Sequence, residues 1–513
     1  MGVQLRHVQR RHTSQPPASP SRRSVAWRAT SVLCVLLLGI TSDALGLGVA
    51  PAPGSFRAGA ATSNITPKLG LSISGSMQDK KVEHIHDELH ARALVLDDGA
   101  TRLAIVVVDS CMIPRQVYDA AKRLVHAHTG LPVQNVLMSA THTHSAPAAG
   151  SVFQSDPDQE YLELLTVRIA DAVRQAINNL EPAEIGWGVG GVPDQVFNRR
   201  WKMRPGSIPP NPFGDVDDVQ MNPPAASPDL VEPAGPTDPE LSIISARALD
   251  GRPIALFANY SLHYVGGIGP GHASADYFGA FARRIEELLR SRSPKRSEGE
   301  SQANDPPFVA ALSNGTSGNI NNINFREAQK SMPPYVQMHR VAHDVAAEAL
   351  RVYETLQHKP GVALDARTTE LTLGVRLPSA KDLDRARRIV SRAKGPNMDT
   401  REEIYARETL FLSEYPKSVS FILQALRIGD LVIAAIPCEV FVEIGLELKE
   451  QSPFKHTFTV SLANGYNGYL PTPEHHKLGG YETWRARSSY LEVEASPKIV
   501  GALLELFQGL HAS

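Results

Sequence analysis

Cysteine is scarce in this chain, which has three cysteines in 513 residues. Cys34 lies in an N-terminal apolar run, which leaves Cys111 and Cys438 for the rest of the protein. A disulfide framework is therefore excluded, and at most one bridge could form. Both of these cysteines follow strand-type runs, where a buried free thiol is the more common state.

An excess of either charge is also absent, since 52 Lys and Arg residues balance 54 Asp and Glu residues. No basic run with interleaved aromatic residues occurs, so we expect no nucleic-acid partner. Internal repeats and a second long linker are lacking as well. With 42% hydrophobic residues, this composition is typical of a soluble globular protein. We predict one large domain over residues 57–510.

The one long hydrophobic run, Ser31–Ile40, is too short to span a bilayer comfortably. It follows an Arg-rich segment without acidic residues, a pattern typical of an export signal. We interpret residues 1–48 as an export signal and a disordered N-terminus, and predict a periplasmic or secreted protein. Arg22 and Arg23 resemble a twin-arginine signal. The alternatives are an uncleaved membrane anchor and a mitochondrial-type presequence.

Strand and helix patterns alternate along the remaining chain. The β-branched run Ala104–Asp109, the amphipathic segment Arg115–His128 and the short run Val136–Met138 predict a βαβ unit. Turn residues at Asp97–Ala100 and Asp250-Gly251 predict hairpins. We therefore expect an α/β fold of mixed β-sheets flanked by helices.

Proline and glycine dominate the stretch from Pro205 to Pro239. Strand patterns resume directly after it, so we predict an ordered surface loop or flap and not a linker between domains. The alternative is a mobile insertion without a function.

Polar side chains follow several of the predicted strands. His142 and His144 are two residues apart, so on an extended backbone they leave the same face of the sheet. This geometry suits metal binding or acid/base chemistry, although ordinary loop histidines remain an alternative. The other strand ends deliver His263, the Asn314–Asn322 loop, Glu439 and Tyr469. A catalytic zinc ion is bound by about three or four such N and O ligands, with one position left open.

Two other zinc arrangements are missing. The chain has no His-Glu-x-x-His pair, which excludes the zincin arrangement. It also lacks the cysteine cluster of the cytidine deaminases.

The motif Thr141-His-Thr-His-Ser145, with a proline and a glycine after it, resembles the signature of the neutral/alkaline non-lysosomal ceramidases, which are secreted or membrane-anchored zinc amidases. Asn259–His263, Pro437-Cys-Glu439 and Asn198-Arg199 are similar to further segments of that family. Tyr469 and Tyr481 reproduce the spacing of its two active-site tyrosines. The resemblance implies one large ceramidase-like catalytic domain, with His142, His263, Glu439 and Tyr469 as zinc ligands and His144, Arg199 and Tyr481 as catalytic residues.

Two departures from the family pattern affect the expected chemistry. Asn321 occupies the position of the family's catalytic serine, and Ser317, just before Gly318, could replace that serine only if the loop were wound differently. The printed sequence also ends where the family's catalytic domain ends. We therefore expect no C-terminal immunoglobulin-like domain, which puts the presentation of a ceramide from a bilayer in doubt.

The function that the resemblance implies is zinc-dependent hydrolysis of an N-acyl amide, such as a ceramide-like lipid. We predict metal-activated water as the nucleophile, because Asn321, at the position of the family's serine, cannot attack. His144 would move the proton, while Arg199 and Tyr481 would stabilise the oxyanion. If Ser317 were the nucleophile, His144 would be its base. One alternative is a zinc hydrolase of a different, non-lipid amide or ester, and another is a non-catalytic zinc-containing binding protein. The expected partner is a small-molecule or lipid amide, with peripheral membrane contact left open.

Overall fold

The structure is a computed structural model that describes residues 56–291 and 306–513. Both ranges belong to the unit Gly48–Ser513. The predicted export signal over residues 1–48 lies outside the described residues. Among the residues that are described, no helix is both long enough and apolar enough to cross a membrane.

The larger sheet has eight strands in the order β16-β14-β13-β8-β1-β5-β6-β7. Two pairs are parallel, β6 with β7 and β14 with β16, whereas the other neighbours are antiparallel. The strands are β1 (Arg57–Asn64), β5 (His90–Asp97), β6 (Arg102–Val108), β7 (Val136–Ala140), β8 (Glu181–Gly191), β13 (Glu240–Ala248), β14 (Pro253–Tyr260) and β16 (Val309–Asn314). The predicted βαβ unit and the hairpins at Asp97–Ala100 and Asp250-Gly251 are confirmed.

A second sheet packs face to face against the first. Its strands are β18 (Leu364–Gly374), β19 (Ser418–Ile428), β20 (Leu431–Ala435) and β22 (His456–Val460), in that order, with β20 and β22 parallel. Phe257 of the larger sheet stacks on Phe458 of the smaller one, with ring centroids 6.2 Å apart. One continuous apolar core therefore fills the space between the sheets.

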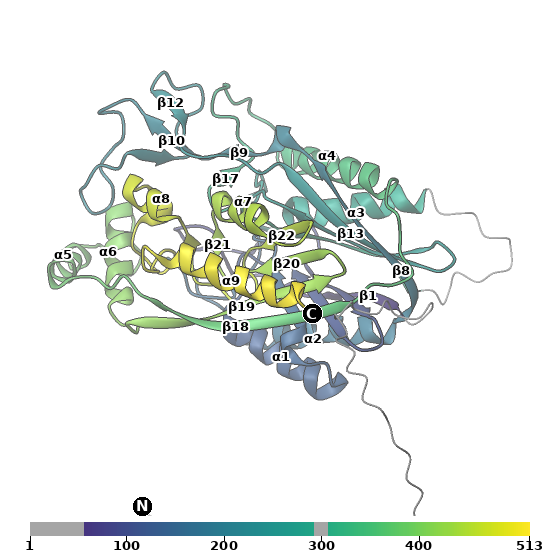
Figure 1. Cartoon of the computed structure of the whole chain (residues 1–513). Helices are drawn as coiled ribbons and strands as arrows, with labels where there is room; N and C mark the ends of the chain where they lie inside the picture. The colour runs from purple at the N-terminus through teal and green to yellow at the C-terminus, as the bar shows by residue number, and fades with distance from the viewer. Residues whose placement is uncertain (1–55, 292–305) are drawn as a thin grey trace, which may run out of the picture. The chain divides into compact units, whose positions relative to one another are not determined.

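Helices cover the outer faces of both sheets (Figure 1). Helices α1 (Arg115–Thr129) and α2 (Gln159–Asn178) lie on the larger sheet near β6, and α3 (Asp276–Arg290) and α4 (Val336–Tyr353) cover its other end. Helices α7 (Val442–Gln451) and α9 (Ala495–His511) cover the smaller sheet. The prediction of mixed sheets flanked by helices in one large domain is confirmed.

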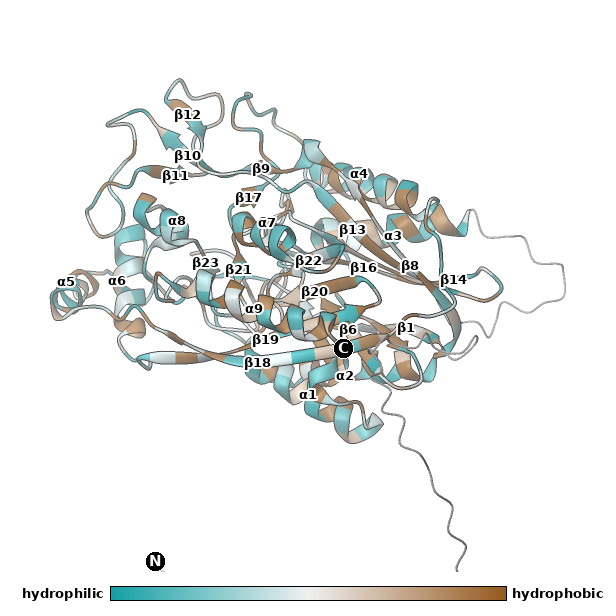
Figure 2. Ribbon diagram, in the orientation of Figure 1, coloured by the Kyte–Doolittle hydropathy of each residue, from teal (hydrophilic) through white to brown (hydrophobic). Residues whose placement is uncertain are grey.

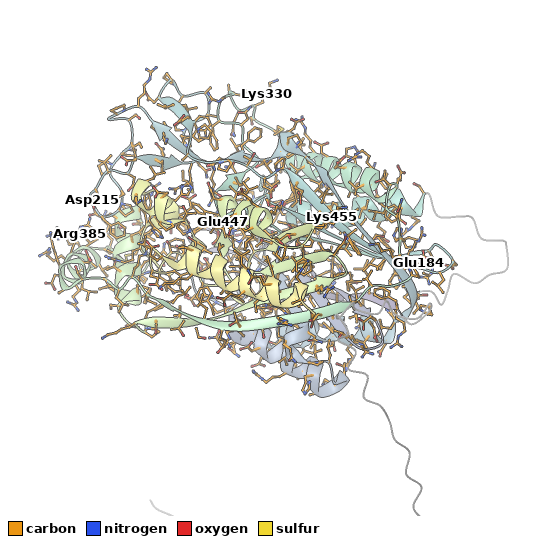
Figure 3. The ribbon with its side chains drawn as sticks, in the orientation of Figure 1. Glu184, Asp215, Lys330, Arg385, Glu447 and Lys455 are labelled. Atoms are coloured by element: carbon orange, nitrogen blue, oxygen red, sulfur yellow. The ribbon has the colours of Figure 1, made fainter. Side chains whose placement is uncertain are left out.

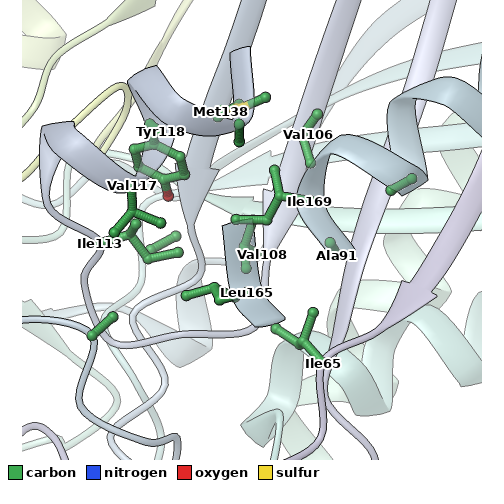
Figure 4. Close-up of a cluster of buried hydrophobic side chains, with 14 of the residues drawn as sticks. Ile65, Ala91, Val106, Val108, Ile113, Val117, Tyr118, Met138, Leu165 and Ile169 are labelled. Carbon is green, nitrogen blue, oxygen red and sulfur yellow. The ribbon is translucent and has the colours of Figure 1, made fainter. Parts of the chain in front are cut away.

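The amphipathic pattern of each helix explains how it packs. In Figure 4, Tyr118 of α1 and Leu165 and Ile169 of α2 point onto Val106 and Val108 of β6. Hydrophobic colour follows the inner strands in Figure 2, while the outer helices carry hydrophilic residues as well. Charged side chains, including the exposed Asp215, Lys330, Glu447 and Lys455, lie at the surface (Figure 3).

The proline-rich stretch from Pro205 to Pro239 is more regular than the predicted loop or flap. It contains β11 (Val219–Met221) and β12 (Leu230–Pro233), which pair with the two edges of β10 (Arg200–Met203). Backbone pairing with β10 therefore orders two strands that the composition does not indicate.

The remaining elements are short. They are β2 (Ser72–Ile73), β3 (Lys80–Lys81), β4 (His84–Ile85), η1 (Val133–Asn135), η2 (Pro193–Gln195), β9 (Phe197–Asn198), β15 (His272–Ala273), β17 (Ile320–Asn321), α5 (Ala380–Val390), α6 (Arg401–Leu412), β21 (Glu439–Val440), β23 (Tyr469–Leu470), α8 (Pro473–Leu478) and η4 (Tyr481–Thr483).

The segment Ser461–Asn464, directly after β22, connects the two edge strands of the larger sheet. Its Ser461 N–H donates to the Asn314 carbonyl at the end of β16 (3.0 Å), and its Asn464 N–H donates to the Met138 carbonyl of β7 (2.7 Å). Strands at opposite ends of the sheet order are therefore neighbours across this segment. The carboxyl ends of the parallel strand pairs of the two large sheets meet there, which is where α/β sheets place their ligands.

Candidate active site

His142 lies just after β7 and has a left-handed backbone, with φ of 74°. Such a conformation is strained for a residue other than glycine, and it recurs at functional sites. The Nδ1–H of His142 donates to the Cys111 carbonyl (2.7 Å). This hydrogen bond fixes the tautomer, so in the neutral ring the lone pair is on Nε2.

His263 follows β14 and is oriented in the same way. Its Nδ1–H donates to the Ser317 carbonyl (3.0 Å), and its Nε2 lies 2.9 Å from His142 Nε2. A backbone carbonyl therefore holds Nδ1 of each imidazole, and the two Nε2 atoms face each other.

Glu439 completes this group at the start of β21. Its Oε2 lies 3.2 Å from His142 Nε2 and 3.8 Å from His263 Nε2. This oxygen is buried and has no hydrogen-bond partner. The other oxygen, Oε1, accepts a hydrogen bond from the Tyr466 hydroxyl (3.0 Å). A buried carboxylate oxygen without a donor is costly unless a cation binds it.

The three side chains fit a divalent metal ion. Their ligand atoms all lie within 4.8 Å of one another, and two nitrogens and one oxygen form a set that suits zinc. Burial alone would lower the pKa of His142, but Glu439 and Cys111 together outweigh it and raise that pKa to about 10. A positive charge is therefore favoured beside Glu439, and a bound metal ion would supply one.

His144 lies beside this group but outside it. Its Nε2 is 3.1 Å from His142 Nε2, and its ring stacks on Tyr264 with centroids 3.6 Å apart. Burial, then the charges of His142 and Arg199, lower the pKa of His144 well below its usual range. His144 is therefore neutral near pH 7.

Tyr469 and Tyr481 line the same pocket, with ring centroids 5.7 Å apart. The Tyr469 hydroxyl accepts a hydrogen bond from Arg199 Nη2 (3.1 Å). The Tyr481 hydroxyl makes no hydrogen bond within the described ranges, so it is available to a ligand.

Arg199 is buried and held by several partners. Its Nε donates to Glu482 Oε1 (2.9 Å), and its Nη2 donates to the Gly318 carbonyl (2.8 Å) as well as to Tyr469. Arg200 binds the other oxygen of Glu482 (2.6 Å). Burial would raise the pKa of Glu482, but Arg200 and Arg199 lower it below its usual range, so this carboxylate stays charged.

Ser317 lies behind His263, on the side away from Glu439. Its hydroxyl donates to Asn314 Oδ1 (2.7 Å) and is 3.4 Å from His263 Nδ1, the outer ring nitrogen. Asn321 belongs to β17, where its Nδ2 donates to Asn222 Oδ1 (2.8 Å). Neither side chain lines the pocket at the histidines.

That pocket is narrow. Phe153, Val152 and Tyr481 are among the side chains that surround it, and its free volume is about 30 Å³. This volume is enough for one or two water molecules.

Two further residues support the site without a clear signal in the sequence. Tyr466 holds Glu439, and Gly75 allows His144 to approach, because a Cβ at position 75 would lie 2.3 Å from His144 Cγ. In the sequence, the only signal for Tyr466 is its position three residues before Tyr469. Nothing in the local sequence distinguishes Gly75 from other turn glycines.

Comparison with known proteins bears on the family and the fold of the chain. A family model described as neutral/alkaline non-lysosomal ceramidase, N-terminal, matches residues 56–331. Neutral ceramidase B of Dictyostelium discoideum is 23% identical over 278 residues, which are 52% of this chain and 35% of that protein. This chain therefore spans only about a third of the length of that relative.

Solved structures have the same fold. The crystal structure of the neutral ceramidase from Pseudomonas aeruginosa matches with a TM-score of 0.65 and 19% identity, covering 90% of this chain and 74% of that one. A ceramidase complexed with C2 matches with a TM-score of 0.66 and 17% identity, covering 90% and 76%. Since the family model covers more than half of the sequence, the chain belongs to the neutral/alkaline non-lysosomal ceramidase family.

Proposed function

We propose that this protein is a zinc-dependent hydrolase that cleaves an N-acyl amide of the ceramide type. Family membership supports the reaction class. The observation that carries the proposal is the buried group of His142, His263 and Glu439, in which one carboxylate oxygen has no donor. Structural zinc sites favour closed, cysteine-rich shells, whereas this set of N and O ligands beside a pocket with room for water is typical of a catalytic site.

The zinc ion would be held by His142, His263 and Glu439, with Tyr469 beside them as a further ligand. When bound, zinc supplies Lewis-acid chemistry, because it polarises a carbonyl group and makes water acidic near neutral pH. The backbone carbonyls of Cys111 and Ser317 keep both histidines in the tautomer that can bind it.

The proton transfers fall to His144. This imidazole is neutral near pH 7. Its Nε2 points toward His142, which forms the proposed metal-ligand group with His263 and Glu439. It would take a proton from the attacking water and then donate that proton to the leaving nitrogen. Tyr481, with its free hydroxyl, would donate to the developing oxyanion. Arg199 would contribute by holding the Tyr469 hydroxyl and by its positive charge.

Water is the nucleophile in this proposal. The Ser317 hydroxyl lies behind the His263 ring and is engaged by Asn314, so it would need a rewound loop to reach a substrate carbonyl. Asn321 has no nucleophilic atom. Ser317 would instead help to fix His263 through its backbone carbonyl.

The test is metal content together with turnover of a fluorogenic N-acyl amine. We expect His142→Ala to lose both the metal and the activity. His144→Ala should keep the metal and lose about 10²- to 10⁴-fold in kcat. Ser317→Ala and Asn321→Ala should retain turnover, and His339→Ala, at an exposed position, is the matched control.

Three results would contradict parts of the proposal. Zinc and full activity in His142→Ala would refute the metal site, and a dead Ser317→Ala with normal metal content would refute water as the nucleophile. A wild type that binds zinc but hydrolyses neither amides nor esters would indicate a non-catalytic binding protein.

We also propose that the protein is exported, by the twin-arginine route. The basis is the sequence of residues 1–48 alone, and N-terminal sequencing of the protein from a periplasmic or culture fraction tests it. An intact N-terminus in a membrane fraction would favour the anchor instead.

A further inference from the structure

The pocket at the metal-ligand residues is too small for the substrate that we propose. Its free volume of about 30 Å³ holds one or two water molecules, whereas pockets that bury a small molecule typically measure about 300–1,000 Å³. Part of the wall must therefore move before an N-acyl amide can reach His142. Residues 151–154, which contribute Val152 and Phe153 to the wall, have the features of a movable segment.

Phe153 is the strained part of this wall. Its backbone has φ of 52°, a left-handed conformation that is unfavourable for a bulky side chain. The Phe153 ring lines the pocket and also belongs to a separate apolar cluster, where it packs edge-on against Tyr405 with centroids 5.9 Å apart. The Tyr405 hydroxyl is buried without a hydrogen-bond partner, which is unfavourable as well. The closed wall is therefore opposed by two local features.

Two arginines hold Phe153 in place despite this strain. Arg407 Nη2 donates to the Phe153 carbonyl (2.6 Å), and Arg487 Nη2 donates to the same oxygen (2.9 Å). Arg487 in turn binds Glu408, which is buried on α6 next to Arg407 (2.9 and 2.7 Å). Hydrogen bonds from charged donors are among the stronger ones, so α6 stabilises the strained wall.

A side-chain amide ties the same wall to the loop between α5 and α6. Gln154 Nε2 donates to the Met398 carbonyl (3.0 Å), and Gln154 Oε1 accepts from the Met398 N–H (2.8 Å). Gln154 Nε2 also donates to Gln78 Oε1 (2.8 Å), which follows the wall residues Gly75 and Ser76. Helices α5 and α6 and their loop, which we call the helical hairpin, are therefore bound to two segments that wall the pocket.

The helical hairpin joins the rest of the protein through one narrow stem. It is inserted between β18 and β19, whose last paired residues on this side are Gly374 and Ser418. In Figure 1 both helices lie beyond the end of these two strands. The inner side of α6 packs on the apolar cluster through Ile404 and Tyr405. A unit that is attached at one end can lift about its stem.

We propose that the helical hairpin is a lid over the metal-ligand pocket and that Phe153 is the gate that it holds shut. Lifting the lid breaks the hydrogen bonds of Arg407 to Phe153 and of Gln154 to Met398. Phe153 then leaves its left-handed conformation, and the pocket opens to the substrate. This inference rests on the proposed amide hydrolysis and specifies how the substrate reaches the site.

Two buried thiols report movement of the lid independently of catalysis. Cys111 lines the pocket, so an alkylating reagent reaches it when the wall opens. Cys438 is buried in the core beneath α7 and α9 and does not line the pocket, so its alkylation reports unfolding instead. Iodoacetamide labelling of both thiols, followed by mass spectrometry, therefore separates lid opening from a general loss of structure.

The variant Arg407→Met removes one bond that holds the gate and keeps an apolar side chain. Its loss raises the fraction of open molecules, and the apparent affinity for the substrate rises by the same factor. We expect the rate of Cys111 labelling and kcat/KM for a fluorogenic N-acyl amine to rise together, by about threefold or more, with Cys438 labelling unchanged. Arg388→Met, at an exposed arginine of the same hairpin, is the matched control and should change none of the three.

The variant Phe153→Gly tests the gate itself. Glycine accepts the left-handed backbone and has no ring to close the pocket. We expect Phe153→Gly to label faster at Cys111 and to have a higher kcat/KM than wild type. Adding Arg407→Met to Phe153→Gly should then change either value by less than about twofold, because the two residues act on the same step.

The outcomes separate the lid from the proposed function. Faster Cys111 labelling in Arg407→Met, in a protein that hydrolyses no amide, would support the lid and refute the hydrolysis. Amide hydrolysis together with wild-type Cys111 labelling in Arg407→Met overturns the lid and leaves the hydrolysis intact. A lower kcat/KM in Arg407→Met, or an equal acceleration at Cys438, also overturns the lid.

Discussion

Tyr466 is the side chain that orients Glu439 toward His142 and His263. Its hydroxyl binds Oε1 and leaves Oε2 facing His142 and His263. Partners of this kind typically contribute 10- to 100-fold in metal affinity. We therefore expect Tyr466→Phe to weaken zinc binding by about that factor, measured by competition with a chelator. Tyr161→Phe removes another buried hydroxyl, bonded to the Ile65 carbonyl, and should leave the affinity unchanged. Equal affinities in the two variants would contradict this role.

Gly75 provides a second prediction at the scale of the residue. It has φ of +97° and touches His144, whereas Gly70 has φ of +91° and no atom within 4 Å of an added Cβ. Gly75→Ala and Gly70→Ala should share a backbone penalty of about 1–2 kcal/mol in the free energy of unfolding. Only Gly75→Ala should displace His144, so we expect its kcat to fall at least tenfold with normal zinc content. Equal kcat values for the two variants would show that the contact is unimportant.

Lys122 links two elements, because its ammonium group on α1 donates to Asn464 Oδ1 after β22 (2.8 Å). Burial lowers the pKa of Lys122 from 10.5 to about 7. The charge of Asp119 raises this pKa, and the charge of Arg115 lowers it further. Between pH 7 and 10.5 the unfolded chain binds a proton that the folded chain has released. The contribution of Lys122 to the free energy of unfolding therefore rises with pH between pH 7 and 10.5, by about 1.4 kcal/mol per pH unit.

The variant Lys122→Met should remove this rise. We expect the difference in unfolding free energy between wild type and Lys122→Met, measured in urea, to change steadily from pH 7 to 10 and to be constant below pH 7. A difference that is independent of pH would mean that Lys122 titrates normally in the folded protein.

The elements themselves were predictable where local sequence determines them. The continuous apolar run of β6 and the helical spacing of α2 are visible in the sequence, because a strand or helix buried by its neighbours needs that pattern. Strand β18 was missed because Arg367–Glu370 is polar and half-exposed, and only pairing with β19 makes it a strand.

The site was predictable only in part. The residue types at the strand ends indicated metal or proton chemistry, and the resemblance supplied their separate roles. Local sequence did not contain the contacts from Tyr466 to Glu439 or from Gly75 to His144, since both depend on how distant segments pack.

At the scale of the whole molecule, metal binding should stabilise the fold. A ligand bound only by the folded state adds about 4 kcal/mol at 1,000 times its dissociation constant. We expect a chelator to lower the midpoint of thermal unfolding of wild type in scanning calorimetry, and to have little effect on His142→Ala. An equal chelator effect on both proteins would place the bound metal elsewhere.

The hydrogen bonds of Ser461–Asn464 to both edges of the larger sheet also govern when the site can form. The metal-ligand group contains His142, His263 and Glu439, which are far apart in sequence. Contacts between residues so far apart in sequence form slowly, because a long loop must close first. A chain emerging from the ribosome would have both histidines long before the segment that brings them together. If the ion binds as proposed, its retention would therefore report that the chain has been made and folded at least as far as Asn464, because a shorter molecule lacks the segment that joins the two edges of the larger sheet.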